Sequence, residues 1–249
     1  MKVSAALSLL LPPCSVKNWL LKMFGWKIAS GCRIGHSWIE AKHVNLGESA
    51  RIGHGNYIKC EALVLHENAY INILNLVTGP FYVVLSSFAA IGNQNKISRA
   101  KKGIAWGKSI LKLGTYSKIT SNHAIDCTRP IKIGDYSTIA GRSTQIWTHG
   151  YMYAPSGLAR FRIDGGVSIG NNVYIGSACV INAAVTISDS ICVGSASCVS
   201  SSLEEPGLYV NQPLRKVPLH YSETLDRYAA LDIEGLVETV VQKRPRMKH

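Results

Sequence analysis

Residues 163–200, with the sequence IDGGVSIGNNVYIGSACVINAAVTISDSICVGSASCVS, carry an apolar residue at every sixth position. These positions are Ile163, Ile169, Ile175, Ile181, Ile187, Val193 and Val199. Small or β-branched residues follow most of them by four positions, at Val167, Val173, Cys179, Val185, Ile191 and Ser197. An α-helix repeats about every 3.6 residues and a half-buried strand every second residue, so this period indicates a short strand followed by a corner. A unit this short cannot bury its own apolar face, so the period favours units that stack into a solenoid over a β-sandwich of short strands.

The same period continues less regularly toward the N-terminus. Its positions there are Ile28, Ile34, Glu40, Leu46, Ile52, Ile58, Val64, Tyr70, Leu76, Tyr82 and Phe88, of which Glu40 breaks the pattern, and the phase changes at Ile91 and Ile97. The inward partners are placed at Cys32, Trp38, Val44, Ala50, Asn56, Ala62 and Asn68. The pattern predicts one all-β solenoid domain over residues 28–217, a helical cap over 1–27, and a C-terminal helix with a basic tail over 218–249.

The composition favours some partners over others. Of the 249 residues, 47% are hydrophobic, and the net charge of +12 favours anionic partners. No zinc-finger, RNA-recognition or helix-turn-helix pattern occurs, so we expect no nucleic-acid partner. We expect the positive charge to serve instead in binding the phosphates of a cofactor or a carrier lipid. The seven cysteines form no C-x-x-C pair. This predicts packed thiols in a reducing compartment, and hence a cytoplasmic protein.

The first 27 residues contain two apolar segments. Residues 5–11 are too few to span a bilayer, and no signal-peptide cleavage site follows them. Ser15 is a candidate N-cap for a helix. Its apolar face is predicted to carry Trp19, Leu20, Met23 and Phe24, flanked by Lys17, Lys22 and Lys27. We expect this helix to cap the open end of the solenoid, and peripheral contact with an anionic membrane is the compatible alternative.

Residues 119–217 contain motifs beyond the repeat itself. They include HAIDCT at 123–128, IGD at 133–135, TIAG at 138–141 and QIWTH at 145–149. These motifs resemble those of the hexapeptide-repeat acyltransferases, and most closely the bacterial sugar O-acetyltransferases that modify capsule, O-antigen or exopolysaccharide sugars. The resemblance implies a left-handed parallel β-helix and a homotrimer with sites between subunits. It also implies direct transfer of an acetyl group from acetyl-CoA to a sugar hydroxyl, without a metal.

The same resemblance implies that His149 is the general base. A sugar hydroxyl is a poor nucleophile near neutral pH, and an imidazole can take its proton as the oxygen attacks the thioester. Counted from Ile139, His149 falls in the inward phase, so we expect a bulge near residues 146–147 to turn it outward. Asp126 either orients the imidazole or holds a corner turn, and His123 either supports the site or is structural.

Further site residues follow from motif positions in the same resemblance. The coils at residues 175–178 and 193–197 are similar to those that line the pantetheine arm of the cofactor. The candidate cofactor-binding residues are Tyr174, Ser177, Ser195, Ala196, Ser200, Arg215 and Lys216. Ser201 stands where the family has a lysine, so one contact to a cofactor phosphate is not carried over. Aromatic rings and arginines near the base suit a sugar acceptor. These candidates are Trp147, Tyr151, Tyr153, Arg160 and Arg162.

Other chemistries fit the sequence less well. A γ-class carbonic anhydrase shares the fold and carries two zinc ligands as H-x4-H, which the histidines between residues 36 and 66 do not provide. Cys127 is a less favoured acyl carrier. N-acylation of an amino sugar and a non-catalytic scaffold are the alternatives to O-acetylation. The basic segment 98–109 is either a solvated loop or an edge that faces a phosphorylated acceptor.

Overall fold

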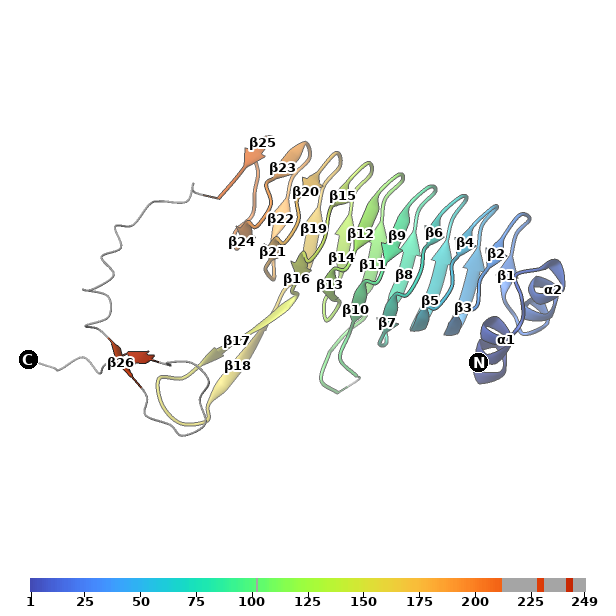
Figure 1. Cartoon of the computed structure of the whole chain (residues 1–249), viewed down its shortest axis with the longest axis horizontal. Coiled ribbons are helices and arrows are strands. Elements are labelled where there is room, and N and C mark those ends of the chain that lie inside the picture. The colour runs from blue at the N-terminus through green and yellow to red at the C-terminus, as the bar shows by residue number, and fades with distance from the viewer. Residues whose placement is uncertain (102, 212–227, 231–240, 244–249) are drawn as a thin grey trace, which may run out of the picture. The chain divides into compact units, whose positions relative to one another are not determined.

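The computed structural model describes residues 1–101, 103–211, 228–230 and 241–243. Its main unit, Met1–Asn211, consists of two short helices followed by a stack of short parallel strands (Figure 1). Each full turn of the chain contributes one strand to each of three faces. This confirms the predicted all-β solenoid, a parallel β-helix consistent with the left-handed form.

Strand pairing defines the three faces. The first face contains the start of β3 (Trp38–Leu46) and of β5 (Tyr57–Leu65), then β7 (Leu76–Thr78), β10 (Lys96–Ser98), β13 (Ala124–Asp126), β16 (Gln145–Ile146), β21 (Val180–Ile181) and β24 (Cys198–Val199). The second face contains β1 (Lys27–Ile28), the ends of β3 and β5, then β8 (Tyr82–Leu85), β11 (Ile110–Leu113), β14 (Ile131–Ile133), β19 (Val167–Ile169) and β22 (Thr186–Ile187). The third face contains β2 (Arg33–Ile34), β4 (Arg51–Ile52), β6 (Tyr70–Ile71), β9 (Ala90–Asn93), β12 (Lys118–Ser121), β15 (Thr138–Ile139), β20 (Tyr174–Ile175), β23 (Ile191–Val193) and β25 (Gly207–Tyr209).

Two turns of the solenoid are longer than the others. Paired residues in β20 and β23 are 18 residues apart, whereas those in β9 and β12 are 28 apart and those in β15 and β20 are 36 apart. The extra residues form the loop 99–109 and a hairpin arm, residues 149–164, made of β17 (His149–Tyr153) and β18 (Arg160–Asp164). Both insertions leave the solenoid between the first and second faces, at what we call the insertion corner (Figure 1).

Part of the predicted repeat is out of phase. Ile163 is 47% exposed in the hairpin arm and is not a solenoid position. From Val64 to Phe88 the prediction is wrong by one residue. The buried residues there are Leu65, Ile71, Val77, Val83 and Ala89. The shift arises in β5, where Ala62 and Leu63 are buried in succession, because a one-residue change of phase moves every later side chain to the opposite face.

Trp38 and Glu40 also lie one position away from the interior. Ile39 and Ala41 are the buried residues in this part of β3, so the prediction that Trp38 points inward is wrong. Glu40 therefore does not interrupt the core, and its carboxylate pairs with Lys59 Nζ at 3.4 Å. The Glu40 side chain lies outside the core but is only 12% exposed, so the ion pair with Lys59 compensates for the partial burial of its charge.

A ladder of polar side chains runs through the interior beside the corner between the third and first faces. Each member accepts a hydrogen bond from the backbone N–H of the member one turn later. Asn56 Oδ1 accepts from Asn75 at 2.9 Å, Asn75 Oδ1 from Asn95 at 2.9 Å, Asn95 Oδ1 from His123 at 3.0 Å, and His123 Nδ1 from Thr144 at 3.1 Å. His123 is 1% exposed, and its imidazole is therefore one rung of a structural ladder.

We expect His123 to make the fold sensitive to acid. Its Nδ1 must be unprotonated to accept the Thr144 N–H, and burial lowers the pKa of His123 from 6.5 to about 4. The resulting stabilisation is complete above pH 6.5 and is lost as the pH falls toward 4, because the unfolded chain binds this proton more readily. His123→Asn repeats the neighbouring rungs and should reduce the loss of unfolding free energy between pH 7 and pH 4 by about 3 kcal/mol. Urea unfolding at both pH values measures this, and an equally steep loss in both proteins would contradict it.

Two helices cap the N-terminal end of the solenoid. They are α1 (Lys2–Leu10), which contacts β3, and α2 (Ser15–Met23), which contacts β1. The predicted packing face of α2 is wrong. Trp19, Met23 and Phe24 are 60%, 67% and 49% exposed, whereas Lys17 and Leu21 are fully buried. In the described part of the chain, no helix is long and apolar enough to cross a membrane.

The C-terminal segment, Gln212–His249, forms a second unit. Within it, β26 (Tyr228–Ala230) and β27 (Val241–Lys243) pair in antiparallel fashion. The predicted C-terminal helix is therefore wrong at these residues, which form strands. The rest of the predicted helix and basic tail, together with residues 212–217 of the predicted solenoid domain, lie outside the described residues.

Candidate functional site

Asp126 and His149 meet at the insertion corner. Asp126 is the last residue of β13, and His149 begins the hairpin arm one turn later. His149 Nδ1 donates a hydrogen bond to Asp126 Oδ2 at 2.9 Å. The Asp126 side chain is 8% exposed and the His149 side chain is 29% exposed. The carboxylate is thus inside the solenoid wall, and the imidazole that it holds reaches solvent.

His149 reaches the surface without the predicted bulge. Ile146 is the next buried strand residue with an apolar side chain after Ile139 and follows it by seven positions, one more than the repeat. This extra residue reverses the phase, so that Thr148 is fully buried in the position predicted to face the other way. The chain then leaves the solenoid as the hairpin arm, and the His149 side chain lies outside the wall.

The Asp126 carboxylate accepts hydrogen bonds on both oxygens. Thr148 donates to Oδ2 from its backbone N–H and its hydroxyl, at 3.1 and 2.6 Å. Thr128 donates to Oδ1 in the same two ways, at 3.2 and 2.8 Å. Burial by itself raises the pKa of Asp126, but the hydrogen bonds from Thr148, His149 and Thr128 more than offset it, and the pKa lies below its ordinary value. Asp126 therefore does both things predicted for it, since it orients the imidazole and holds the corner.

The opposite nitrogen of the imidazole is available. An ionised carboxylate only accepts hydrogen bonds, so it keeps a proton on His149 Nδ1 and leaves Nε2 as an acceptor. Among the described residues, Nε2 has no hydrogen-bond partner. The rings of Trp147 and Tyr151 stand edge-on to the imidazole, with centroids 6.3 and 6.0 Å away. Nε2 can therefore accept a hydrogen bond or a proton from a ligand at this corner.

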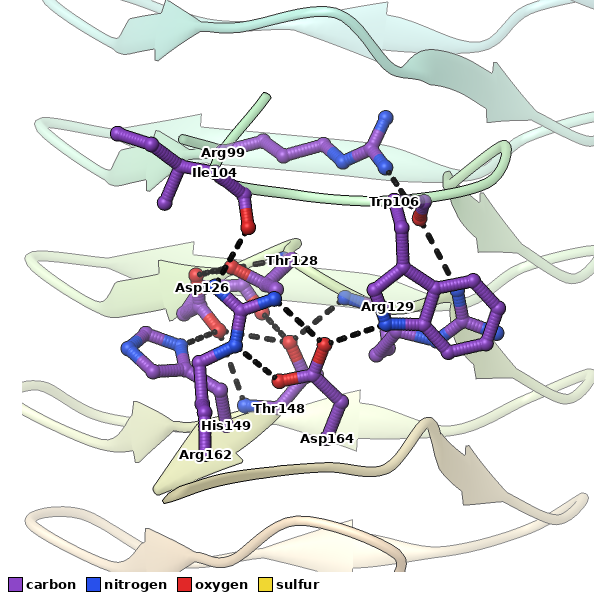
Figure 2. A network of polar contacts seen from close by, with 10 residues as sticks. All are labelled: Arg99, Ile104, Trp106, Asp126, Thr128, Arg129, Thr148, His149, Arg162 and Asp164. Atoms are coloured by element: carbon purple, nitrogen blue, oxygen red, sulfur yellow. Dashed lines mark hydrogen bonds and ion pairs between the residues drawn. The ribbon is translucent and has the colours of Figure 1, made fainter. Parts of the chain in front are cut away.

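The two insertions are tied together beside this pair (Figure 2). Asp164 lies opposite His149 in the hairpin register. Arg162 binds the Asp164 carboxylate through Nε and Nη2, at 2.7 and 2.9 Å, and its Nη1 donates to the Ile104 carbonyl at 2.6 Å. Trp106 Nε1 donates to Asp164 Oδ2 at 2.8 Å. The base of the hairpin arm is therefore held by a side chain from the other insertion.

Two further arginines hold the loop 99–109. The Arg129 guanidinium lies 3.7 Å from the centroid of the Trp106 ring and donates to the Trp106 carbonyl at 3.1 Å. Arg99 is 8% exposed and donates to three backbone carbonyls. Arg99 is thus structural, not part of an edge facing an acceptor, while Lys101 and Lys108 of the same segment are exposed.

The predicted acceptor residues fall into two groups. Trp147, Tyr151 and Tyr153 are 40%, 47% and 61% exposed. Arg160 donates to the Tyr153 hydroxyl at 2.7 Å, and its guanidinium lies 5.0 Å from the Tyr151 ring centroid. Tyr151, Tyr153 and Arg160 are accessible along β17 and β18, and Trp147 is accessible just before β17. Arg162, by contrast, is engaged by the network in Figure 2 and positions the hairpin arm.

The predicted cofactor residues lie at a different corner from His149. Ser177, Ser195 and Ala196 belong to the corner between the third and first faces, which we call the small-residue corner. The coils there are in close contact, since Ser195 Oγ accepts from the Ser177 N–H at 3.2 Å. A Cβ at Gly141, on the preceding coil, would overlap Ser177 Oγ. The width of the first face separates this corner from His149 within one chain.

The remaining predicted cofactor residues are dispersed. Tyr174 is 50% exposed on the third face, and Ser200 follows β24 at the end of the first face. Arg215 and Lys216 lie outside the described residues. One chain therefore does not assemble the predicted cofactor residues into a single site with His149.

Cys127 is separated from this chemistry by burial. It is fully buried, and burial raises its pKa well above the ordinary range. A thiol in that state is a poor nucleophile. Within the ranges that the structure describes, no three His, Cys, Asp or Glu side chains are grouped so as to hold a metal ion.

Sequence reasoning missed the residues that support the pair. Thr148 and Thr128 fix the Asp126 carboxylate, and Trp106 and Asp164 join the two insertions. The motif positions identified the histidine and the carboxylate alone. A usable signal was present in the threonines, each of which follows or flanks a predicted site residue inside a matched motif.

Comparison with known proteins gives likenesses at the level of structure. No family model and no curated protein matches the chain. The hexapeptide-repeat acetyltransferase VCA0836 of Vibrio cholerae, solved with acetyl-CoA, is 29% identical over 42% of this chain and 57% of that chain, with a TM-score of 0.37. The polysialic-acid-specific acetyltransferase NeuO is 16% identical, covers 76% and 82% of the two chains and has a TM-score of 0.45. The N-acyltransferase AntD of Bacillus cereus, solved with dTDP and CoA, is 16% identical, covers 72% and 89%, and has a TM-score of 0.36. The chain thus resembles the hexapeptide-repeat acyltransferases, both in its sequence motifs and in its parallel β-solenoid.

Proposed function

We propose that this protein is an O-acetyltransferase that moves an acetyl group from acetyl-CoA to a hydroxyl of a sugar, with His149 as the general base. The observation that carries the proposal is the His149–Asp126 pair at the mouth of the insertion corner. A buried, fully hydrogen-bonded carboxylate fixes the tautomer and the direction of the imidazole. A non-catalytic scaffold gains nothing from a buried carboxylate whose effect is to hold an imidazole with Nε2 toward solvent.

The pair is suited to the proton transfers of acetyl transfer. His149 Nε2 takes the proton of the acceptor hydroxyl as its oxygen attacks the thioester carbonyl carbon. The tetrahedral intermediate then collapses with cleavage of the carbon–sulfur bond, and Nε2 returns the proton to the departing sulfur. Asp126 stabilises the imidazolium formed between these steps without itself taking a proton.

The small-residue corner fits the thin pantetheine arm of acetyl-CoA. Ser177, Ser195 and Ala196 present small side chains, and the backbone at Gly141 is close enough to the next coil to exclude a side chain. Such a wall permits close approach of an extended ligand. The bound cofactor would supply the activated thioester, and the residues of this chain would hold its arm along the wall.

A second copy of the chain is needed to bring the two corners together. Since the small-residue corner and His149 lie at opposite edges of the first face, we propose the homotrimer that the sequence motifs imply. The hairpin arm supports this, because it exposes large apolar side chains that a two-stranded ribbon in water does not stabilise. They are Met152, Leu158, Phe161 and Ile163, at 52%, 98%, 60% and 47% exposure.

We further propose that the acceptor belongs to a cell-surface polysaccharide or its precursor and that the protein is cytoplasmic. The accessible rings of Tyr151 and Tyr153 with Arg160 suit a sugar ring that carries a carboxylate or phosphate. NeuO is described as an acetyltransferase specific for polysialic acid. AntD is described as an N-acyltransferase. Transfer to an amino sugar is therefore the competing outcome.

Thermal unfolding of the purified protein with acetyl-CoA tests cofactor binding. Ligand at about one hundred times its Kd should stabilise the protein by about 2.7 kcal/mol and raise the Tm. Free CoA is the positive control and Zn²⁺ the negative control. Release of the CoA thiol is then followed with matched hydroxyl-bearing and amino-bearing sugars. Release with the amino sugars alone would replace O-acetylation by N-acylation, and no shift with either form of CoA would favour the scaffold.

A further inference from the structure

Helix α2 has an inverted polarity. Lys17 and Leu21 face the solenoid and are fully buried. The opposite side carries Val16, Trp19 and Met23, at 60%, 60% and 67% exposure, and Phe24 follows the helix at 49% exposure. Val16, Trp19 and Met23 recur at helical spacing and lie on one side of α2. Together with Phe24, which directly follows the helix, they form what we call the apolar stripe. An ordinary cap would bury such a stripe and expose the lysine.

Lys17 explains why the stripe faces outward. Its Nζ lies within hydrogen-bond distance of four backbone carbonyls, those of Ser8, Leu11, Ile34 and Gly35, at 2.6, 3.0, 2.9 and 2.9 Å, which share its three N–H donors. Two of these carbonyls belong to the C-terminal end of α1, and two belong to the first turn of the solenoid. The ammonium thus joins both helices to the solenoid and fixes the rotation of α2. The hydrogen bonds of Lys17 therefore keep the apolar stripe facing outward. In an ordinary amphipathic helix the apolar side would pack against the solenoid instead.

The surroundings of the stripe are basic. Residues 1–39 contain no aspartate or glutamate. Lys2, Lys22 and Lys27 are exposed, and we call them the basic rim. The neighbouring helix α1 adds further exposed apolar side chains, namely Val3 and Leu10, at 59% and 73%. Aromatic and aliphatic residues surrounded by lysines are the composition of helices that lie in the headgroup region of anionic bilayers.

We propose that this helical cap binds the surface of an anionic lipid bilayer, with the apolar stripe inserted at headgroup level and the basic rim against lipid phosphates. Charge favours this occupant over a second copy of the chain, because two caps that meet face to face would bring together the lysines of residues 1–39, a segment that contains no aspartate or glutamate. The inference is independent of the proposed acetyl transfer, and it places the opposite end of the solenoid, with β25, away from the membrane.

Co-flotation of the full-length protein with lipid vesicles tests this inference. We expect binding to vesicles that contain phosphatidylglycerol in phosphatidylcholine, little binding to phosphatidylcholine alone, and weaker binding at high salt. Trp19→Gln with Met23→Gln should lower the bound fraction at least about tenfold, because the inserted apolar area is lost. The Tm of this double variant should stay that of the parent, since both side chains are exposed.

Matched control variants distinguish vesicle binding by the cap from nonspecific hydrophobic or electrostatic binding by the rest of the protein. Leu208→Gln with Val210→Gln removes two side chains of similar exposure, 71% and 67%, at the other end of the solenoid, and should leave vesicle binding unchanged. Lys22→Gln with Lys27→Gln should weaken binding more than Lys118→Gln with Lys132→Gln, which removes the same charge elsewhere. Equal binding to neutral vesicles, or full binding by the Trp19/Met23 variant, would overturn the proposal. Self-association that only this variant abolishes, without vesicle binding, would assign the stripe to contacts between copies.

Discussion

Replacement of His149 by alanine is expected to lower acetyl turnover by about 10²-fold or more, the range in which general bases contribute. Without Nε2 nothing positioned at the insertion corner takes the proton of the acceptor hydroxyl. The fold should persist, because the Asp126 carboxylate keeps four of its five hydrogen bonds. Steady-state release of the CoA thiol gives kcat, and the Tm increase caused by acetyl-CoA reports whether cofactor binding is retained.

His66→Ala is the matched control for this variant. His66 is exposed on a coil of the N-terminal half and takes no part in the site. It should retain full turnover. If His149→Ala turned over as fast as the parent, His149 would have no part in the reaction. If it failed to respond to acetyl-CoA as well, the loss would reflect the site as a whole instead of the proton transfer.

Replacement of Asp126 by asparagine is expected to affect both stability and turnover. Each carboxylate oxygen accepts a backbone N–H, from Thr128 on Oδ1 and from Thr148 on Oδ2. Neither N–H can reverse, so an amide NH₂ faces a donor in either orientation. One buried donor is then unsatisfied, at a cost of about 1–3 kcal/mol. His149 also loses the carboxylate that selects its tautomer, and turnover should fall by roughly 10²–10⁴-fold.

Asp135→Asn provides the control for this change. Asp135 accepts a backbone N–H from Thr115 on Oδ1 at 2.7 Å, and no backbone N–H binds its other oxygen among the described residues. Its amide can therefore turn the oxygen to the donor. Urea unfolding should show a smaller loss for Asp135→Asn than for Asp126→Asn, with unchanged turnover. Equal losses in the two variants would mean that the paired backbone donors do not matter.

The solenoid could be predicted because the apolar repeat that specifies it lies within a short stretch of sequence. Ile169, Ile175 and Ile181 recur within one turn, and each repeat must bury the same face in the same way. The prediction was wrong where one residue was added. In β5 and between Ile139 and Ile146 an extra residue reverses which side chains face inward. A segment with one added residue remains as apolar as before. Only its stacking against the neighbouring turns shows which of its residues are buried.

The contact between His149 and Asp126 was partly predictable for the same reason. HAIDCT and QIWTH are contiguous motifs, so the sequence named Asp126 and His149 as candidates. Their contact depends on stacking of consecutive turns, because 23 residues separate them. The network of Trp106, Arg162 and Asp164 spans 58 residues between two insertions. No local pattern carries such a pairing.

The sequence alone predicted a stacked β-solenoid over a β-sandwich of short strands, since seven apolar residues recur in one six-residue phase and units this short must stack to be buried. It also determined which histidine and carboxylate are candidates for catalysis. Only the tertiary structure decided the direction of each side chain. It turned His149 outward, placed His123 in an interior ladder and buried Lys17 while exposing Trp19. The physical reason is that a buried polar group needs hydrogen-bond partners, and folding brings these from other parts of the chain. The Thr144 N–H satisfies His123 from the next turn, and carbonyls of α1 and of the first solenoid turn surround Lys17.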